Sequence, residues 1–153
     1  MVAFLIGYSF SFETALIESS IPIRHIEKKS NAPMYITNIE CTPAGRFSGP
    51  LAVSMRPVKN EKISRAVLCT GRFPSLHGAP VHIGDPAPIG IRDINNVDFG
   101  EAVEIREGEV PIFWACGVTP QAVLMKSKPS FAITHSPGHM FVSDKKDADY
   151  SIL

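Results

Sequence analysis

Apolar and polar residues alternate along this chain with two different periods, one typical of strands and one typical of helices. The short apolar run at residues 2–6 predicts a buried strand. Apolar residues at helical spacing from Phe12 onward predict a helix that ends near Glu18. Alternation at residues 21–26, which include a proline, predicts a strand near the edge of a sheet.

The middle of the chain predicts a small β-α-β layer. A strand is expected at residues 34–39. Residues 51–56 alternate regularly, which predicts a second strand with Leu51, Val53 and Met55 on one face and Ala52, Ser54 and Arg56 on the other. Helical spacing at residues 60–71 predicts a helix, and residues 81–84 predict a strand that returns to the same layer.

After a polar stretch, the first pattern returns. A strand is predicted at residues 110–115, a turn at Cys116 and Gly117, and a helix from Pro120 to about residue 126. A further strand is predicted at residues 131–134. When the N-terminal stretch is shifted by 108 residues, it aligns without a gap with the stretch that begins at Val110. This alignment suggests two similar strand-helix units.

Together these elements predict an α/β fold. Residues 1–33 and 89–144 should form a mixed αβα layered core, which is discontinuous in sequence. Residues 34–88 should form an inserted two-layer α+β lobe, and residues 145–153 a solvated tail.

Each of the two similar units would bring a polar turn to the N-terminus of a helix. Parallel α/β sheets bind ligands at that edge, and helix N-termini bind anions. The side chains expected to share this rim are those of Ser9, Ser11, Cys116, Thr119 and His135. A thiol just before a helix N-terminus favours the thiolate, although Cys116 could equally be a buried strand end.

Residues 72–86 hold titratable groups on backbone that proline and glycine restrict. His82 should point away from the face that buries its neighbours. It could act as a base oriented by Asp85, or the two could ligate a divalent ion. His135 and His139 lie four residues apart across a turn, which is a weaker metal pattern. The alternative is a turn-rich connector whose histidines bond nearby carbonyl groups.

Arg46 is the leading candidate for binding a carboxylate, because glycine and proline restrict its loop and guanidinium binds carboxylate bidentately. Arg56 and Arg72 are further candidates. For each of the three, a surface ion pair is the alternative.

Composition excludes several classes of protein. Fifteen basic residues balance fifteen acidic ones, so no basic field would hold a nucleic acid. The longest apolar stretch, residues 110–118, is too short to span a bilayer. Three widely spaced cysteines argue against a disulfide framework and for the cytoplasm.

Several longer motifs are specific. They are GYSFSFE from residue 7, PAGRF from 43, VSMRP from 53, HGAPVHIGDP from 77, FWACGVTPQ from 113 and HSPGHM from 135. In these motifs the chain resembles, from Val2 to about Asp144, the bacterial hydro-lyase family that is related to the D-glutamate cyclase of animal mitochondria. The chain departs from the family pattern in two ways. Family members carry a substantial N-terminal region before the position of Val2, and they usually have a cysteine where this chain has Tyr8.

The resemblance implies a hydro-lyase, a carbon–oxygen lyase that acts on a small carboxylate amino acid or its lactam, such as D-glutamate and 5-oxo-D-proline. On this hypothesis His82, oriented by Asp85, and His135 act as base and acid. The Ser9–Ser11 turn and the amides from Gly117 to Thr119 would bind a carboxylate or an oxyanion. Arg46 would bind the second carboxylate. Cys116 would be a polar wall or a proton carrier.

Two alternatives stay open. One is a non-catalytic binder of small carboxylates, such as a truncated regulatory relative. The other is a metal-dependent enzyme that uses His82, Asp85, His135 and His139, with a divalent ion such as Mn²⁺ as its cofactor. The expected partner is a small-molecule carboxylate and neither nucleic acid nor a membrane, and a homo-oligomer is left open.

Overall fold

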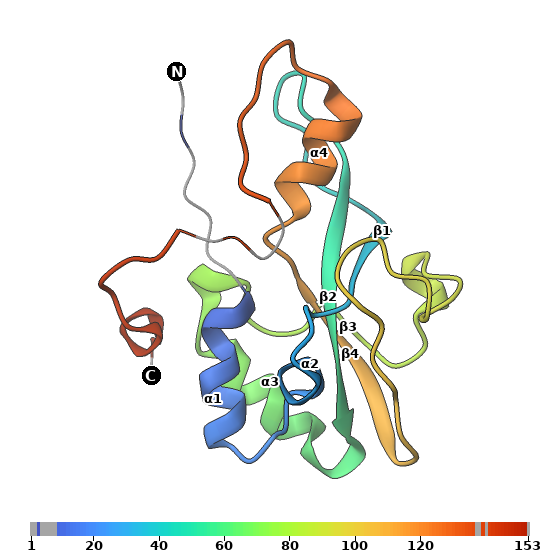
Figure 1. The fold of residues 1–153 in the computed structure, drawn as a ribbon, viewed down its shortest axis with the longest axis vertical. Coiled ribbons are helices and arrows are strands. Elements are labelled where there is room, and N and C mark those ends of the chain that lie inside the picture. Colours follow the sequence, from blue (N-terminus) through green and yellow to red (C-terminus); the bar gives the residue numbers. More distant parts are fainter. Residues whose placement is uncertain (1–2, 4–8, 137–138, 140, 153) are drawn as a thin grey trace.

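The computed structural model describes residue 3 and residues 9–136, 139 and 141–152 (Figure 1). The strand predicted at residues 2–6 lies outside the described residues, apart from Ala3, which is exposed.

A four-stranded antiparallel sheet runs through the domain in the order β1-β2-β4-β3. Its strands are β1 (Met34–Glu40), β2 (Pro50–Lys59), β3 (His82–Ile83) and β4 (Glu109–Ala115). Since β2 and β3 both run antiparallel to β4, which lies between them, they are parallel to each other. The connection between them contains helix α3 (Ile63–Gly71).

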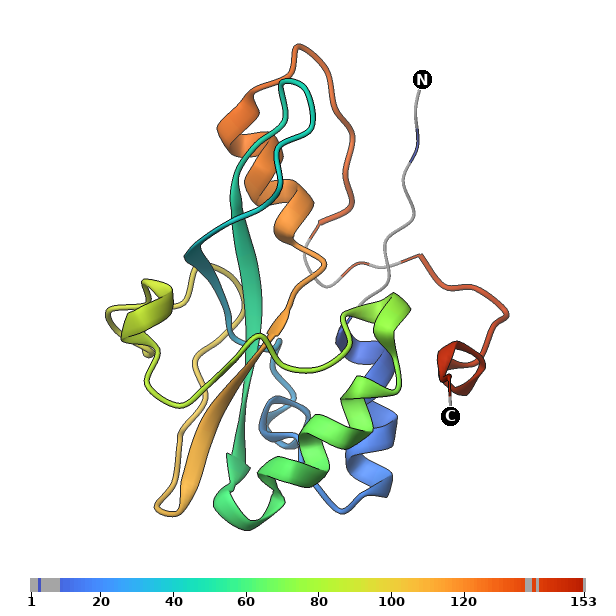
Figure 2. The same ribbon diagram turned by 180° about the vertical axis from the view of Figure 1, so that it is seen from behind.

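Helices cover one face of this sheet, which we call the helical face (Figures 1 and 2). They are α1 (Glu13–Glu18), which follows a 3₁₀ turn at Ser9–Phe12, α2 (Arg24–Lys28) and α3. Ser54, Arg56 and Val58 of β2 face them, as do their partners in β4. The core of this face contains Phe12, Leu16, Ile21, Ile23, Val58, Ala66, Phe73, Leu76, Ile112 and Trp114.

Helix α4 (Thr119–Ser127) extends the helical face beyond the other helices, alongside β2 (Figure 2). The chain turns directly from β4 into this helix. The close approach explains Gly49, because a Cβ at that position would lie 3.0 Å from the Cα atom of Val123.

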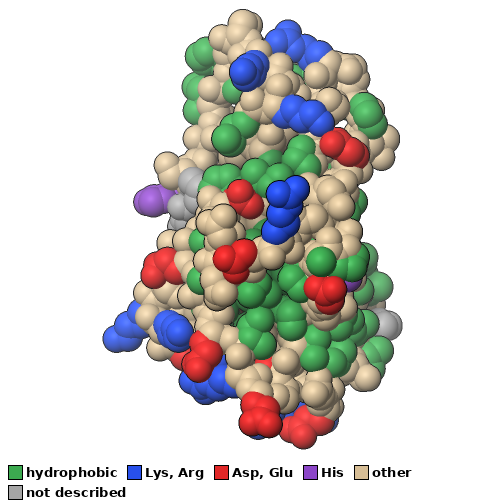
Figure 3. All heavy atoms as spheres, turned by 90° about the vertical axis from the view of Figure 1, so that its right-hand side faces the viewer, with side chains coloured by type: hydrophobic (Ala, Val, Ile, Leu, Met, Phe, Trp, Pro, Cys, Tyr) green, Lys and Arg blue, Asp and Glu red, His purple; other side chains and the backbone are tan. Residues whose placement is uncertain are grey.

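The opposite face of the sheet is covered by the segment 87–108, which contains a 3₁₀ turn at Ala87–Ile89. From this segment Ile89, Ile91 and Val103 pack on Tyr35, Val53, Met55 and Phe113 of the sheet. Figure 3 views the molecule from this side and shows hydrophobic side chains gathered at the surface between the charged ones.

The α/β class is confirmed, and so are the helices predicted near residues 12–18, 60–71 and 120–126. Strands occur at all four positions predicted between residues 34 and 115. The predicted division into a layered core and an inserted lobe at residues 34–88 does not correspond to two separate sheets, because β4 pairs with both β2 and β3. The division into these two units stays a prediction.

The strand predicted at residues 21–26 is wrong. Only its first three residues lack helical structure, with Ile21 and Ile23 buried, and the chain then turns into α2. A short apolar alternation cannot by itself exclude a helix. Contacts from Arg24 and His25 to distant residues stabilise the helical turn.

Residues 52–56 are buried on both faces of β2, because helices cover one face and the segment 87–108 covers the other. Two further predictions need correction. Residues 131–134 form no strand. The tail is not wholly solvated, since a 3₁₀ turn at Asp147–Tyr150 places Tyr150 against the core of the helical face.

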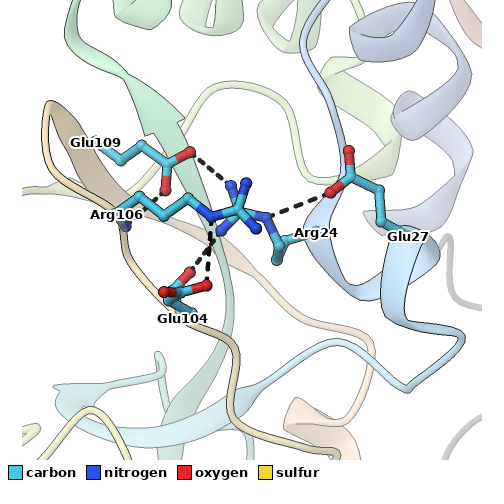
Figure 4. Close-up of polar contacts among 5 residues, drawn as sticks. All are labelled: Arg24, Glu27, Glu104, Arg106 and Glu109. Atoms are coloured by element: carbon cyan, nitrogen blue, oxygen red, sulfur yellow. Dashed lines mark hydrogen bonds and ion pairs between the residues drawn. The ribbon is translucent and has the colours of Figure 1, made fainter.

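A buried ion pair joins α2 to the start of β4 (Figure 4). Arg24 donates from Nη2 to Oε1 of Glu109 at 2.6 Å and from Nη1 to the carbonyl oxygen of Glu104 at 2.9 Å. The second carboxylate oxygen of Glu109 accepts from the amide of Arg106 at 2.8 Å. Both charged groups of the pair are buried and hydrogen-bonded, which offsets their desolvation.

We expect Arg24→Ala to lower the free energy of unfolding by about 3–5 kcal/mol, because it leaves the buried carboxylate of Glu109 without its partner. Urea titration followed by circular dichroism measures the change. The matched control is Arg106→Ala, which removes an exposed pair with Glu104 and should cost less than about 1 kcal/mol. Equal losses in the two variants would contradict the assignment.

Candidate functional site

Cys116 lies at the corner where β4 ends and α4 begins. Its thiol is buried and accepts hydrogen bonds from the amides of Val118 and Gly117 and from the hydroxyl of Ser54. The charge of Arg56 also acts on it. The predicted position of this thiol before a helix N-terminus is confirmed, and we call this arrangement the Cys116 corner.

The expectation that this corner favours the thiolate is wrong. Burial raises the pKa of the Cys116 thiol, and the amides, the Ser54 hydroxyl and the Arg56 charge offset that effect only in part. The thiol therefore keeps its proton at neutral pH and can donate a hydrogen bond.

Thr119 joins the Cys116 corner to β2. Its hydroxyl donates to the carbonyl oxygen of Cys116 at 2.7 Å and accepts from the amide of Ala52 at 3.1 Å. The side chain does not cap α4, because Thr119 is the first residue of the helix and its hydroxyl bonds backward. It holds the turn against the sheet.

A second polar group on the helical face is the fully buried guanidinium of Arg56. Its Nη1 donates to Oγ of Ser54 at 2.9 Å, and its Nε donates to Oε1 of Glu13 at 2.8 Å, with a further bond from Nη2 to the same oxygen. The guanidinium lies 5.2 Å from the ring centroid of Phe12 and 5.5 Å from that of Trp114, which allows cation–π attraction to both.

Glu13, in the first turn of α1, links this cation to α2. Its Oε1 lies 3.3 Å from Nε2 of the buried His25. Burial raises the pKa of the Glu13 carboxyl, but Arg56 and His25 outweigh burial and hold the pKa below its ordinary value. Continuous contacts thus join five side chains, from the thiol to the imidazole, which we call the buried network: Cys116, Ser54, Arg56, Glu13 and His25.

Sequence reasoning identified only part of the buried network. Arg56 was a candidate for binding a substrate carboxylate, but its guanidinium is buried and paired with Glu13 of the same chain. Glu13, Ser54 and His25 were missed. The available signal was a cation in the middle of a strand whose neighbouring positions are apolar, which predicts a buried charge in need of a partner.

His82 lies away from the Cys116 corner. Its partner across β3 and β4 is Phe113, whose ring is 5.8 Å away and which packs on the face opposite the helices. Val81 and Ile83 are the more exposed residues, so the predicted orientation of His82 is wrong. This edge strand is only two residues long, and its register depends on β4.

Asp85 does not orient His82 through its carboxylate. The imidazole Nε2 donates to the backbone carbonyl oxygen of Asp85 at 2.5 Å, while the carboxylate accepts from the amide of Ala87 at 3.1 Å. The carbonyl and the carboxylate of Asp85 therefore both form hydrogen bonds within the turn, as expected if residues 72–86 are a turn-rich connector.

The other predicted residues occupy the surface or a separate hollow. Arg46 is exposed beside the Phe47 ring, and His135 is exposed, with Nδ1 donating to the carbonyl oxygen of Ser136 at 2.7 Å. Ser11 lines a hollow of about 80 Å³ between α1 and the C-terminal turn. Ser9 begins the turn before α1.

Within the described part of the chain, no three His, Cys, Asp or Glu side chains are close enough to hold a metal ion. That statement covers His82, Asp85, His135 and His139, the four weak metal candidates.

A larger hollow of about 260 Å³ lies at the outer edge of β1. It is lined by residues of both charges, Arg92, Asp93 and Asp98 among them. Burial, together with the carboxylates of Asp93 and Asp98, raises the pKa of Tyr35 well above its ordinary range, and its hydroxyl donates to the carbonyl oxygen of Ile94 at 2.7 Å. The sequence had pointed to none of these residues.

Fold and site define an α/β domain with a protonated thiol at a helix N-terminus and a buried guanidinium–carboxylate pair behind it. The model of the D-glutamate cyclase family matches residues 2–144. The chain belongs to the D-glutamate cyclase family, as its motifs had indicated.

Curated relatives are similar over the whole chain. Proteins named "Putative hydro-lyase" from Psychrobacter arcticus and Bacillus licheniformis are 61% and 62% identical over all 153 residues, and one from a Thermoanaerobacter species is 66% identical over 146 residues, 95% of this chain. The chain spans 58%, 58% and 55% of their respective lengths. None of the helices in the described ranges is both long and apolar enough to cross a membrane.

We expect Glu13→Gln to destabilise the protein by about 3–5 kcal/mol near neutral pH, because Arg56 then stays buried without a carboxylate. The folded-state pKa of Glu13 is lowered, so its contribution is complete above the ordinary value of 4.5 and is lost as the pH falls through the lower folded-state value. Urea titrations at a series of pH values should show the difference between wild type and variant shrinking below that point.

The control for this pH dependence is Glu18→Gln, an exposed carboxylate at the other end of α1, which should change stability little at any pH. A difference between wild type and Glu13→Gln that grows on acidification would show that the sign is wrong.

Cys116 should be the slowest of the three cysteines to react with iodoacetamide in the folded protein near neutral pH, because its thiol is buried and its pKa is raised. Mass spectrometry of the peptides measures each rate, and unfolding in urea should bring the rates close together. Rapid modification of Cys116 in the folded state would indicate an accessible thiolate instead.

Proposed function

We propose that this chain forms part of a hydro-lyase that acts on a small carboxylate amino acid or its lactam, interconverting D-glutamate and 5-oxo-D-proline. The observation that carries the proposal is the family match over residues 2–144. The names of the relatives support the same class of reaction. Because the chain spans just over half of the length of those proteins, the proposed activity is that of a full-length family member.

The reaction is a cyclisation with loss of water. The amino nitrogen of glutamate attacks the side-chain carboxyl carbon, a carbon–nitrogen bond forms, and a carbon–oxygen bond breaks. A base must take the proton from the amine, donors must stabilise the oxyanion that develops, and an acid must protonate the departing oxygen. The proton and hydroxide leave as water, so no oxidant or reductant is consumed.

The Cys116 corner suits two of these tasks. The positive end of α4 favours a carboxylate or an oxyanion beside this corner. The raised pKa of Cys116 favours the protonated thiol, which we assign as a polar wall or proton carrier behind the corner, and no covalent bond to substrate is needed. The buried network behind the corner holds Ser54 in place and supplies positive charge.

His135 is proposed as the base. It lies on the segment that follows α4 and returns along the long axis of the molecule toward the first turn of that helix (Figures 1 and 2). His82, on the opposite face of the sheet, cannot act on the same substrate atom from its position beside Phe113. Arg46 remains the proposed site for the second carboxylate.

A non-catalytic binder of small acids is the second proposed function. It rests on the same helix N-terminus, whose positive end can bind a carboxylate whether or not turnover follows.

The test is incubation of the protein with D-glutamate, and separately with 5-oxo-D-proline, with and without Mn²⁺, followed by chiral chromatography. We expect both incubations to approach the same ratio of the two compounds. Cys116→Ala should lower kcat by about 100-fold or more, as expected for loss of a proton carrier, while the control Cys41→Ala should retain activity.

Thermal unfolding in the presence of each compound separates the two proposed functions. Stabilisation without interconversion would favour the binder. Absence of both interconversion and stabilisation would contradict the assignment of these substrates.

A further inference from the structure

The segment that follows α4 exposes four large apolar side chains. The exposed fractions are 71% for Phe131, 78% for Ile133, 79% for Phe141 and 86% for Val142. We call these four residues the apolar strip. None of them belongs to the core clusters on either face of the sheet.

The sequence around the apolar strip is unlike that of a solvated segment. Residues 129–142 contain no Asp, Glu, Lys or Arg, although these make up 20% of the chain. Charged residues are depleted in the centres of protein interfaces, whereas solvated loops are rich in them. Burying each apolar side chain of this size is worth about 1.5–3 kcal/mol, so leaving four in water is costly.

The backbone at the start of this segment, residues 129–134, makes no ladder with another strand of the described part of the chain. Phe131 and Ile133 alternate with smaller residues in the pattern of a strand, yet no backbone hydrogen bond joins residues 129–134 to any other described residue. A strand pattern without a neighbouring strand offers a row of donors and acceptors to whatever lies beside it.

The apolar strip lies inside the region that the family shares. The family model extends to residue 144, and the relatives from Psychrobacter arcticus and Bacillus licheniformis align over the entire chain. Those relatives are longer, and about two-fifths of their length lies outside the match. A family fold of that size contains further polypeptide that can cover the segment.

We propose that residues 129–134 pair as a strand with the part of the D-glutamate cyclase family fold that this chain does not span, and that this part buries the apolar strip. The occupant is a polypeptide with an apolar surface and a free strand edge. Since His135 lies between the two halves of the strip, the occupant also contacts the surroundings of that imidazole.

The test combines this chain with the part of a relative that lies outside the match. The portion of the Psychrobacter arcticus protein that lies outside the match is co-expressed with this chain and carries a purification tag. We expect a one-to-one complex by light scattering, and hydrogen exchange of the amides at residues 129–134 should slow at least about tenfold on binding.

Variants locate the interface. Ile133→Asp should weaken the complex at least about tenfold, because it places a charge in an apolar contact. The matched control is Leu68→Asp, on α3, whose side chain is 72% exposed, and it should bind as the wild type does. Both variants replace exposed side chains, so both should unfold at the wild-type temperature when alone.

Three results would overturn the proposal. They are failure of the two polypeptides to associate, an association that Ile133→Asp leaves unchanged, and a homodimer of this chain alone that Ile133→Asp dissociates while Leu68→Asp does not. The last would assign the apolar strip to a second copy. The measurements report binding and not turnover, so they are independent of the proposed reaction.

Discussion

The buried guanidinium of Arg56 is the charge on which the helical face depends. Removing such a group from water is costly unless it gains strong partners. It gains a carboxylate from Glu13, a hydroxyl from Ser54 and the faces of two aromatic rings. Helix α1 must therefore dock with Glu13 toward the sheet, and this orientation also buries Phe12 and Leu16.

The same guanidinium interacts with parts of the chain that are distant in sequence. Glu13 precedes it by 43 residues, and the Cys116 corner follows it from another strand. Because Ser54 contacts both the guanidinium and the thiol, the electrostatics of the corner depend on how well α1 is docked. Stability of the helical face and the protonation of Cys116 are thus physically coupled.

Much of the fold followed from local spacing. The helix around Leu16 and strands β1, β2 and β4 were predicted because apolar periodicity is a property of neighbouring residues. The turn from Cys116 into α4 was predicted for the same reason. Helix α2 was not, since its contact from Arg24 to Glu109 crosses 85 residues.

The candidate site was less predictable. The position of Cys116 is local, but its pKa depends on burial, which the whole fold determines. Glu13 and Arg56 carry no local sign that they meet, and the face on which His82 lies depends on the register between β3 and β4. Pairings of this kind are set by tertiary structure, beyond the reach of spacing.

The position of β4 has a consequence for biosynthesis. It is the last strand of the sheet to leave the ribosome, yet it lies between β2 and β3 and joins them. Among the described strands, only β1 and β2 can pair before residue 115 has emerged, and two strands alone are barely stable in water. The sheet therefore closes late, over contacts distant in sequence, which favours slow folding of this domain.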